Sequence, residues 1–302
     1  MKNKYAFVAV MLIAIMLVGM GLTNFYVSQS AEGQKEEEIT IVTSFYPIYI
    51  ATLNVVGDAD QVQLKNLSEP QTGCLHDFQL TPEDMKLLST ADVFLINGGG
   101  IESFMQEVAG AYPDLTVIEA CENNTLLTDE DEENAHAWMS VSDYEIQVQT
   151  IADELAKADP NRAAQYERNA SVYIEKLEKL RERQQAIFEA AEGQSVILFH
   201  EAFDYVAEDY GLSVSYVLDL DEERQVSAGE LADVMAAITK DDVQYIFVEE
   251  LYGKKTAETV KKEADVTVIY LDPLNRGDYE KDSYLEGMSK NLDLLEQSLG
   301  KE

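Results

Sequence analysis

Short runs of β-branched and aliphatic residues alternate along this chain with longer segments in which apolar residues recur every three or four positions. The first pattern is typical of buried strands and the second of amphipathic helices. Strands that alternate with helices build a parallel sheet with helices on both faces. The expected strands cover residues 39–42, 62–64, 93–96, 115–118, 195–199, 213–216, 245–248 and 266–271.

One helical pattern is much longer than the others and lies near the middle of the chain. It opens at Asp159-Pro160 and keeps its apolar spacing as far as Ile187. We therefore expect an α/β fold with two parallel-sheet α/β lobes, residues 37–141 and 194–302, joined by a helical segment over residues 142–193 that contains this long helix.

The N-terminus has the pattern of a targeting segment. Lys2 and Lys4 precede an apolar stretch over residues 6–22, and small and polar residues follow as far as Ala31. This pattern predicts an export signal over residues 1–31 and places the protein at the cell surface or in the periplasm. The stretch is also long enough to stay as a membrane anchor if it is not cleaved, so both outcomes stay open. No cysteine follows the stretch directly, so a lipid-modified N-terminus is not expected.

The charge of the chain narrows the choice of partners. The formal net charge is −35 at pH 7, which excludes nucleic acid as a natural partner and argues against an anionic membrane surface. Two cysteines, Cys74 and Cys121, are consistent with one disulfide in an exported protein. A zinc-binding thiolate at Cys74 and a free thiol are the alternatives.

The candidate chemistry lies in the histidines. The chain has three, His76, His136 and His200, and each follows or ends a short apolar run, as does Asp272. Neutral imidazole is the commonest nitrogen ligand for a transition metal, and three imidazoles with one carboxylate make a tetrahedral zinc set. His76 and His136 belong to the first expected lobe, whereas His200 and Asp272 belong to the second. We therefore predict a metal site in the cleft between the lobes, with Glu249 as the alternative fourth ligand.

The segments around these residues resemble the metal-binding lipoproteins and periplasmic proteins of the ATP-driven zinc and manganese importers, in the solute-binding cluster with a rigid interlobe helix. The resemblance extends from about Ile39 to the end of the chain. Its motifs are C-L-H-D-F-Q-L-T-P-E-D at 74–84, N-A-H-A-W-M-S at 134–140, L-F-H-E-A-F-D-Y at 198–205, I-F-V-E at 246–249 and I-Y-L-D-P-L at 269–274. Leucine stands before His76 where the family has proline, and the acidic run at 129–133 stands where many zinc-binding relatives have a histidine-rich loop.

The resemblance implies a monomeric, non-enzymatic solute-binding protein that captures zinc and delivers it to an ABC-type permease. It implies His76, His136, His200 and Asp272 as the metal ligands. Manganese-selective relatives have glutamate at the position of His200, because the harder ion prefers oxygen, so zinc is favoured over manganese here. The alternatives are a manganese-binding homologue, a zinc hydrolase with Glu201 or Glu249 as general base, and an adhesin on the same fold.

Overall fold

The computed structural model describes Met11, Met16 and residues 38–73, 75–76, 78–129, 132–220 and 224–299. The expected export signal or anchor at 1–31 lies outside the described residues apart from the two methionines. Among the residues that are described, no helix is both long and apolar enough to cross a membrane. Ile39–Glu302 form one compact unit, separate from Met1–Glu38. The fold described below is that of the unit Ile39–Glu302. The boundaries between the two lobes expected from the sequence stay a prediction.

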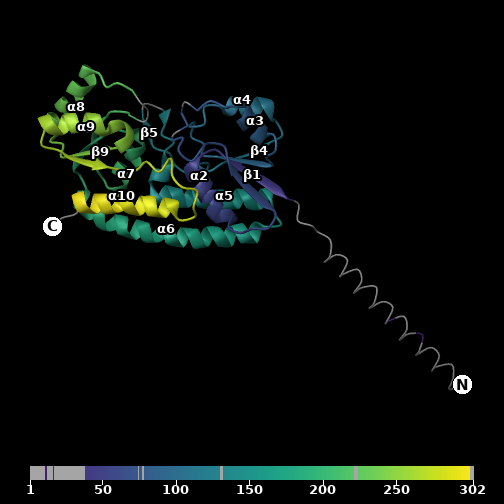
Figure 1. Cartoon of the computed structure of the whole chain (residues 1–302). Helices are drawn as coiled ribbons and strands as arrows, with labels where there is room; N and C mark the ends of the chain where they lie inside the picture. The colour runs from purple at the N-terminus through teal and green to yellow at the C-terminus, as the bar shows by residue number, and fades with distance from the viewer. Residues whose placement is uncertain are drawn as a thin grey trace. The chain divides into compact units, whose positions relative to one another are not determined.

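The first half of the chain forms a four-stranded parallel sheet in the order β2-β1-β3-β4. All four residues of the inner strand β3 are buried, as expected for a parallel strand with helices on both faces. Helices α3 and α4 lie on one side of this sheet and α2 and α5 on the other (Figure 1). The elements are β1 Ile39–Thr43, α2 Tyr46–Val56, β2 Val62–Asn66, α3 Pro82–Leu88, β3 Val93–Ile96, α4 Met105–Ala111 and β4 Thr116–Glu119.

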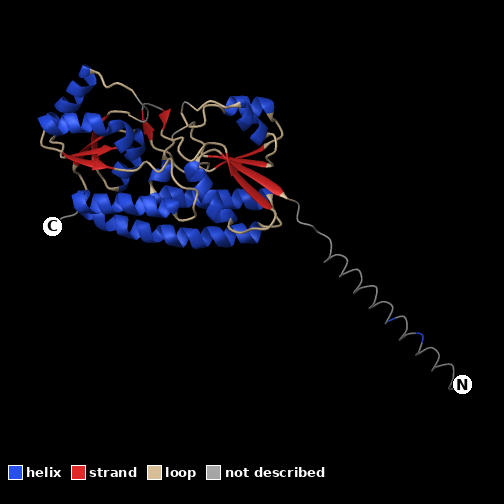
Figure 2. Ribbon diagram, viewed as in Figure 1, coloured by secondary structure: helices blue, strands red, loops and turns tan. Residues whose placement is uncertain are grey.

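The second half repeats this arrangement. Its four parallel strands have the order β10-β9-β7-β8. Starting from the β8 edge, the strands of this sheet lie in the order second, first, third and fourth by their place in the chain. The first sheet has the same order. Figure 2 shows the two sheets as separate groups of strands, each surrounded by helices, which confirms the predicted α/β fold. The elements are β7 Ser195–Leu198, the 3-10 turn η2 Glu201–Phe203, α7 Asp204–Asp209, β8 Ser213–Val217, α8 Ala228–Asp241, β9 Tyr245–Val248, α9 Glu250–Glu263 and β10 Thr267–Tyr270.

A layer of long helices runs along one side of both sheets (Figure 1). It contains α5 Val141–Ala158, α6 Ala163–Ala191 and α10 Ser283–Leu299, and α6 packs against α5, α10 and α2. The 29 residues of α6 correspond to a length of about 44 Å. The predicted long helix is therefore confirmed, although it starts later than expected. Asp159 ends α5 instead, and its carboxylate accepts hydrogen bonds from Arg162 and Tyr166, both at 2.8 Å.

One segment is more ordered than its composition indicated. Residues 122–135 were expected to be an irregular solvated loop, because they lack apolar periodicity and include a run of acids. The structure contains a short antiparallel pair in this segment, β5 Thr128–Asp129 and β6 Glu132–Glu133. Strands of two residues are too short to leave a periodic signal in the sequence.

Candidate metal centre

The carboxyl ends of the parallel strands carry the predicted ligands. His76 lies in the loop after β2, His136 lies in the loop after β4, and His200 comes two residues after β7. Ligand sites in open parallel sheets form at this edge, where neighbouring crossovers leave in opposite directions. In the second sheet, that point lies between β7 and β9, and Glu249 directly follows β9. The fold therefore delivers loops with metal-binding side chains from both sheets.

The three histidines lie together. His136 is central, with its ring centroid 5.4 Å from that of His76 and 5.2 Å from that of His200. His136 and His200 are fully buried, whereas the side chain of His76 is 36% exposed. The structure thus gathers every histidine of the chain from loops of two different sheets.

Asn134 fixes the orientation of the central histidine. Its Oδ1 atom accepts a hydrogen bond from His136 Nδ1 at 2.9 Å and one from the His136 backbone N–H at 3.0 Å. With Nδ1 donating, the lone pair is on Nε2, the arrangement that metal-binding histidines adopt. Burial, followed by the nearby His200 and His76 rings, lowers the pKa of His136 well below its usual value of 6.5. The neutral ring is the form that binds a metal ion.

Glu249 is the acidic neighbour of His200. Its Oε2 atom lies 3.3 Å from His200 Nδ1, and its Oε1 atom accepts a hydrogen bond from Arg276 Nη2 at 3.0 Å. Glu249 is 3% exposed, so this charged group is buried against its partners. A carboxylate behind Nδ1 orients the ring and increases the basicity of Nε2. The geometry places Glu249 beside His200, and the ligand role considered for it as an alternative stays a prediction.

Asp272 lies two residues after β10, and its carboxylate is held within its own loop. Its Oδ1 atom accepts a hydrogen bond from the backbone N–H of Leu274. The backbone N–H of Asp272 donates to Asn291 Oδ1 at 2.9 Å, and Asn291 Nδ2 donates to the backbone carbonyl of Asp272 at 2.8 Å. Within the described part of the chain, no hydrogen bond or ion pair joins the Asp272 carboxylate to a histidine. The structure brings three of the four predicted ligands into contact, and the role of Asp272 stays a prediction.

Glu201 is an acid that lies beside two of the histidines. Its Oε1 atom is 3.6 Å from His76 Nε2 and 3.5 Å from His136 Nδ1. Ligand atoms of these three residues all lie within 4.8 Å of one another, so they could hold a metal ion. The sequence suggested Glu201 only as a general base in the hydrolase alternative. Its place directly after His200 was the available signal.

A buried acid supports the loop that carries His136. The Glu102 carboxylate accepts hydrogen bonds from the backbone N–H groups of Asn97 at 2.7 Å and Gly98 at 3.1 Å. Burial raises the pKa of Glu102 to about 7 in spite of these hydrogen bonds. Asn97 Nδ2 then donates to the carbonyl of Ala135, next to His136, at 2.9 Å. Glu102 thus holds the turn after β3 against the His136 loop.

Trp138 connects that loop to the second half of the chain. It lies in the 3-10 turn η1 Ala137–Met139 and is fully buried. Its indole N–H donates to the carbonyl of Pro273 at 2.8 Å, and its own carbonyl accepts a hydrogen bond from Tyr284 Oη at 2.7 Å. The Trp138 ring also lies 5.0 Å from the His136 ring. The segments around His136 and Asp272 are therefore joined directly.

The predicted disulfide between Cys74 and Cys121 is not present at Cys121, which is a free, buried thiol. Gln147 Nε2 lies 2.9 Å from its sulfur, and burial raises the pKa of the thiol to about 12. Cys74 lies outside the described residues. Inside the protein, Cys121 packs as a small apolar side chain, which explains its presence without a covalent partner.

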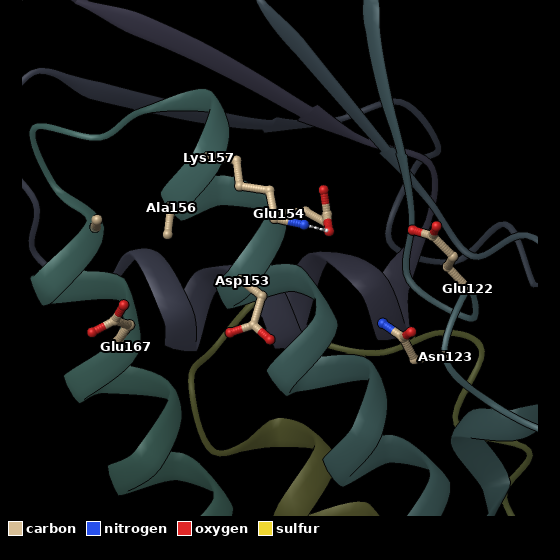
Figure 3. Close-up of a pocket in the computed structure, with 8 residues that line it drawn as sticks. Glu122, Asn123, Asp153, Glu154, Ala156, Lys157 and Glu167 are labelled. Carbon is tan, nitrogen blue, oxygen red and sulfur yellow. Dashed lines mark hydrogen bonds and ion pairs between the residues drawn. The ribbon is translucent and has the colours of Figure 1, made fainter.

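A separate surface hollow lies beside the helical layer (Figure 3). Helices α5 and α6 and the loop after β4 form its walls, and no predicted metal ligand lines it. Its acidic side chains are spread around one lysine, Lys157, which pairs with Glu154. The charged residues that line it are Glu122, Asp153, Glu154, Lys157 and Glu167.

Several known proteins are similar to this chain in sequence and fold. The zinc-binding protein AdcA of Streptococcus pyogenes is 30% identical over 301 residues, which cover 89% of this chain and 57% of AdcA. The chain thus spans little more than half the length of AdcA. The manganese-binding lipoprotein MntA of Halalkalibacterium halodurans is 27% identical over 306 residues, covering 99% of each chain.

The chain is also similar to solved structures of metal-binding proteins and matches the model of one protein family. The solute-binding protein FpvC of Pseudomonas aeruginosa, in complex with Ni2+, has a TM-score of 0.79 and 31% identity, covering 88% of this chain and 99% of FpvC. The model of the family described as zinc-uptake complex component A, periplasmic (ZnuA), matches residues 41–298. The chain therefore belongs to the ZnuA family of metal-binding solute-binding proteins.

Proposed function

We propose that this protein captures zinc outside the cytoplasm and, as a monomer, delivers it to an ABC-type permease. The proposed ligands are His76, His136 and His200, with Asp272 as the carboxylate carried over from the family pattern. The observation that supports this most strongly is the meeting of all three histidines, with ring centroids 5.2 and 5.4 Å apart, from loops of two sheets. The relatives named above are themselves described as metal-binding proteins.

Zinc is the first choice of cargo because the donor set is rich in nitrogen. Imidazole suits zinc, whereas manganese favours carboxylate, carbonyl and water oxygen. Manganese is the second candidate, since MntA is similar over its whole length and is described as manganese-binding. Elemental analysis of the purified protein, followed by calorimetric titration with Zn2+ and with Mn2+ separately, distinguishes the two.

A binding role also fits the chemistry better than hydrolysis. A hydrolytic zinc site keeps one position open for water, whereas a site closed by four protein ligands holds its ion without turnover. A zinc-loaded protein that hydrolysed ester or peptide substrates, with an exchangeable water on the metal, would contradict the binding proposal.

The central test is the variant His200→Ala. Because it removes a proposed ligand from a fully buried position, the affinity for Zn2+ should fall on the order of 100-fold or more. The metal-free fold should persist, since His200 lies in the loop after β7 and is not part of either apolar core cluster. Calorimetry measures the affinity, and circular dichroism of the metal-free protein checks the fold. Unchanged zinc affinity in the folded variant would remove His200 from the site.

A further inference from the structure

Glu201 occupies the mouth of the histidine cluster. Its side chain is 37% exposed and that of His76 is 36% exposed, whereas His136 and His200 are fully buried. An ion that arrives from solvent therefore meets Glu201 and His76 before it can reach His200. The residue types at this mouth, one imidazole and one carboxylate, are both common metal ligands.

The distance between Glu201 and His76 is close to that between two ligands of one ion. Zinc binds imidazole nitrogen and carboxylate oxygen at about 2.0–2.2 Å, so two ligand atoms on one tetrahedral ion lie about 3.3 Å apart. Glu201 Oε1 lies 3.6 Å from His76 Nε2, which is longer than a good hydrogen bond. Its 3.5 Å contact with His136 is to Nδ1, the nitrogen that donates to Asn134, but ligand atoms of His76, His136 and Glu201 all lie within 4.8 Å of one another. Among the described residues, moreover, the buried His76 Nε2 atom has no hydrogen-bond partner.

Asn134 holds this arrangement in place. Its Oδ1 atom binds His136 Nδ1, while its Nδ2 atom donates to the carbonyl of Glu201 at 2.9 Å. One amide side chain thus fixes the positions of Glu201 and His136 relative to each other, although they come from different halves of the chain. Pre-arranged donors of this kind reduce the cost of ordering them when an ion binds.

We propose that Glu201 is a metal-binding residue which, with His76 and His136, forms a three-donor capture set for the incoming divalent cation. The set takes the ion from solvent and passes it inward to His200. This role rests on the proposed function, because it presupposes a cation that His136 and His200 bind. It adds a carboxylate donor at the solvent side to the predicted ligand set.

The test is the variant Glu201→Gln, with Glu208→Gln as its matched control. Glu208 is an exposed acid on the neighbouring helix α7, so both variants lose one negative charge from the same region. Stopped-flow mixing with Zn2+ alone, followed through Trp138 fluorescence, should give association about 10-fold slower for Glu201→Gln than for Glu208→Gln. Titration with Co2+ should also show altered visible absorption bands for Glu201→Gln, because a carboxylate donor is lost.

The outcomes separate this proposal from the proposed function. Equal association rates and identical Co2+ spectra for the two variants would overturn the role of Glu201, while tight zinc binding by both would leave the histidine site intact. Failure of the unmodified protein to bind Zn2+ would overturn both. If Glu201→Gln does not fold, Glu201→Asp replaces it, with slower association expected because the shortened carboxylate no longer reaches His76.

Discussion

At the scale of single residues, the candidate centre includes side chains that lie against the histidines. Asn134 sets the ring of His136 by a hydrogen bond to Nδ1, which leaves Nε2 as the metal-binding nitrogen. The Glu249 carboxylate lies 3.3 Å from Nδ1 of His200. Both buried histidines therefore have a neighbouring polar side chain that a search for ligands alone would overlook.

The variant Glu249→Gln tests this supporting role. It keeps the shape of the side chain but removes the charge that faces His200 Nδ1 and pairs with Arg276. We expect the zinc affinity to fall about 10- to 100-fold, the usual effect of losing such a partner. Calorimetry measures the change, and Glu250→Gln, an exposed acid one residue along, is the control. A complete loss of binding would instead favour Glu249 as a ligand.

The sequence predicted part of this centre and not the rest. The three histidines could be found because they are rare and follow apolar runs. The contact of Glu201 with His76 and His136 could not, since it depends on how loops from two sheets meet. Asp272 was placed in the ligand set by a motif match, and that role stays a prediction, since its Oδ1 atom accepts a hydrogen bond from the backbone of Leu274.

At the scale of elements, close packing between helices and strands positions the loops. Gly253 in α9 is the clearest case, because a Cβ atom there would lie 2.5 Å from Cγ1 of the buried Val248 in β9. Glycine lets the helix approach the strand at the residue before Glu249. Gly229 in α8 has space instead, with the nearest atom 3.8 Å from a Cβ.

These two glycines give a matched pair of variants. Gly253→Ala should lower the free energy of unfolding by about 1–2 kcal/mol, because overpacking a well-filled core outweighs the gain in helix propensity. Gly229→Ala should leave it unchanged or raise it by about 0.5 kcal/mol, since alanine favours the helix and its Cβ atom would make only an ordinary contact, with Ser227 Oγ at 3.8 Å. Urea denaturation followed by circular dichroism measures both. Equal effects of the two variants would show that α9 can shift away from β9 without cost.

Element boundaries were predictable to different degrees. Runs such as β3 and β9 appear in the sequence at their observed residues, because buried parallel strands are continuously apolar. The start of α6 was predicted too early, because Asp159 resembles the first cap of a helix in the sequence. In the structure Asp159 is the residue that ends α5, and its carboxylate accepts hydrogen bonds from Arg162 and Tyr166. Whether Asp159 begins one helix or ends another depends on these tertiary partners and not on local helix propensity.

At the scale of the molecule, two sheets with the same strand order are joined into one unit. Buried residues of both sheets, such as Ile41 and Phe247, share one core cluster, while others of the second sheet, such as Ile246, form a second cluster. Trp138 lies at the junction between the two halves. It forms hydrogen bonds with Pro273 and Tyr284 from the second half, and its ring packs edge-on against that of Phe45 from the first half, with the ring centroids 5.1 Å apart. Such continuity predicts that the halves unfold together.

The tryptophan makes this expectation measurable, because Trp138 is the sole tryptophan of the sequence. Its fluorescence reports the junction beside His136, whereas far-UV circular dichroism reports all helices. In urea, the two signals should change with one midpoint. Zinc at 100 times its dissociation constant should move both together, by about 2.7 kcal/mol in the free energy of unfolding. A fluorescence transition at lower urea than the dichroism transition would mean that the junction opens first and that each half is stable without the other.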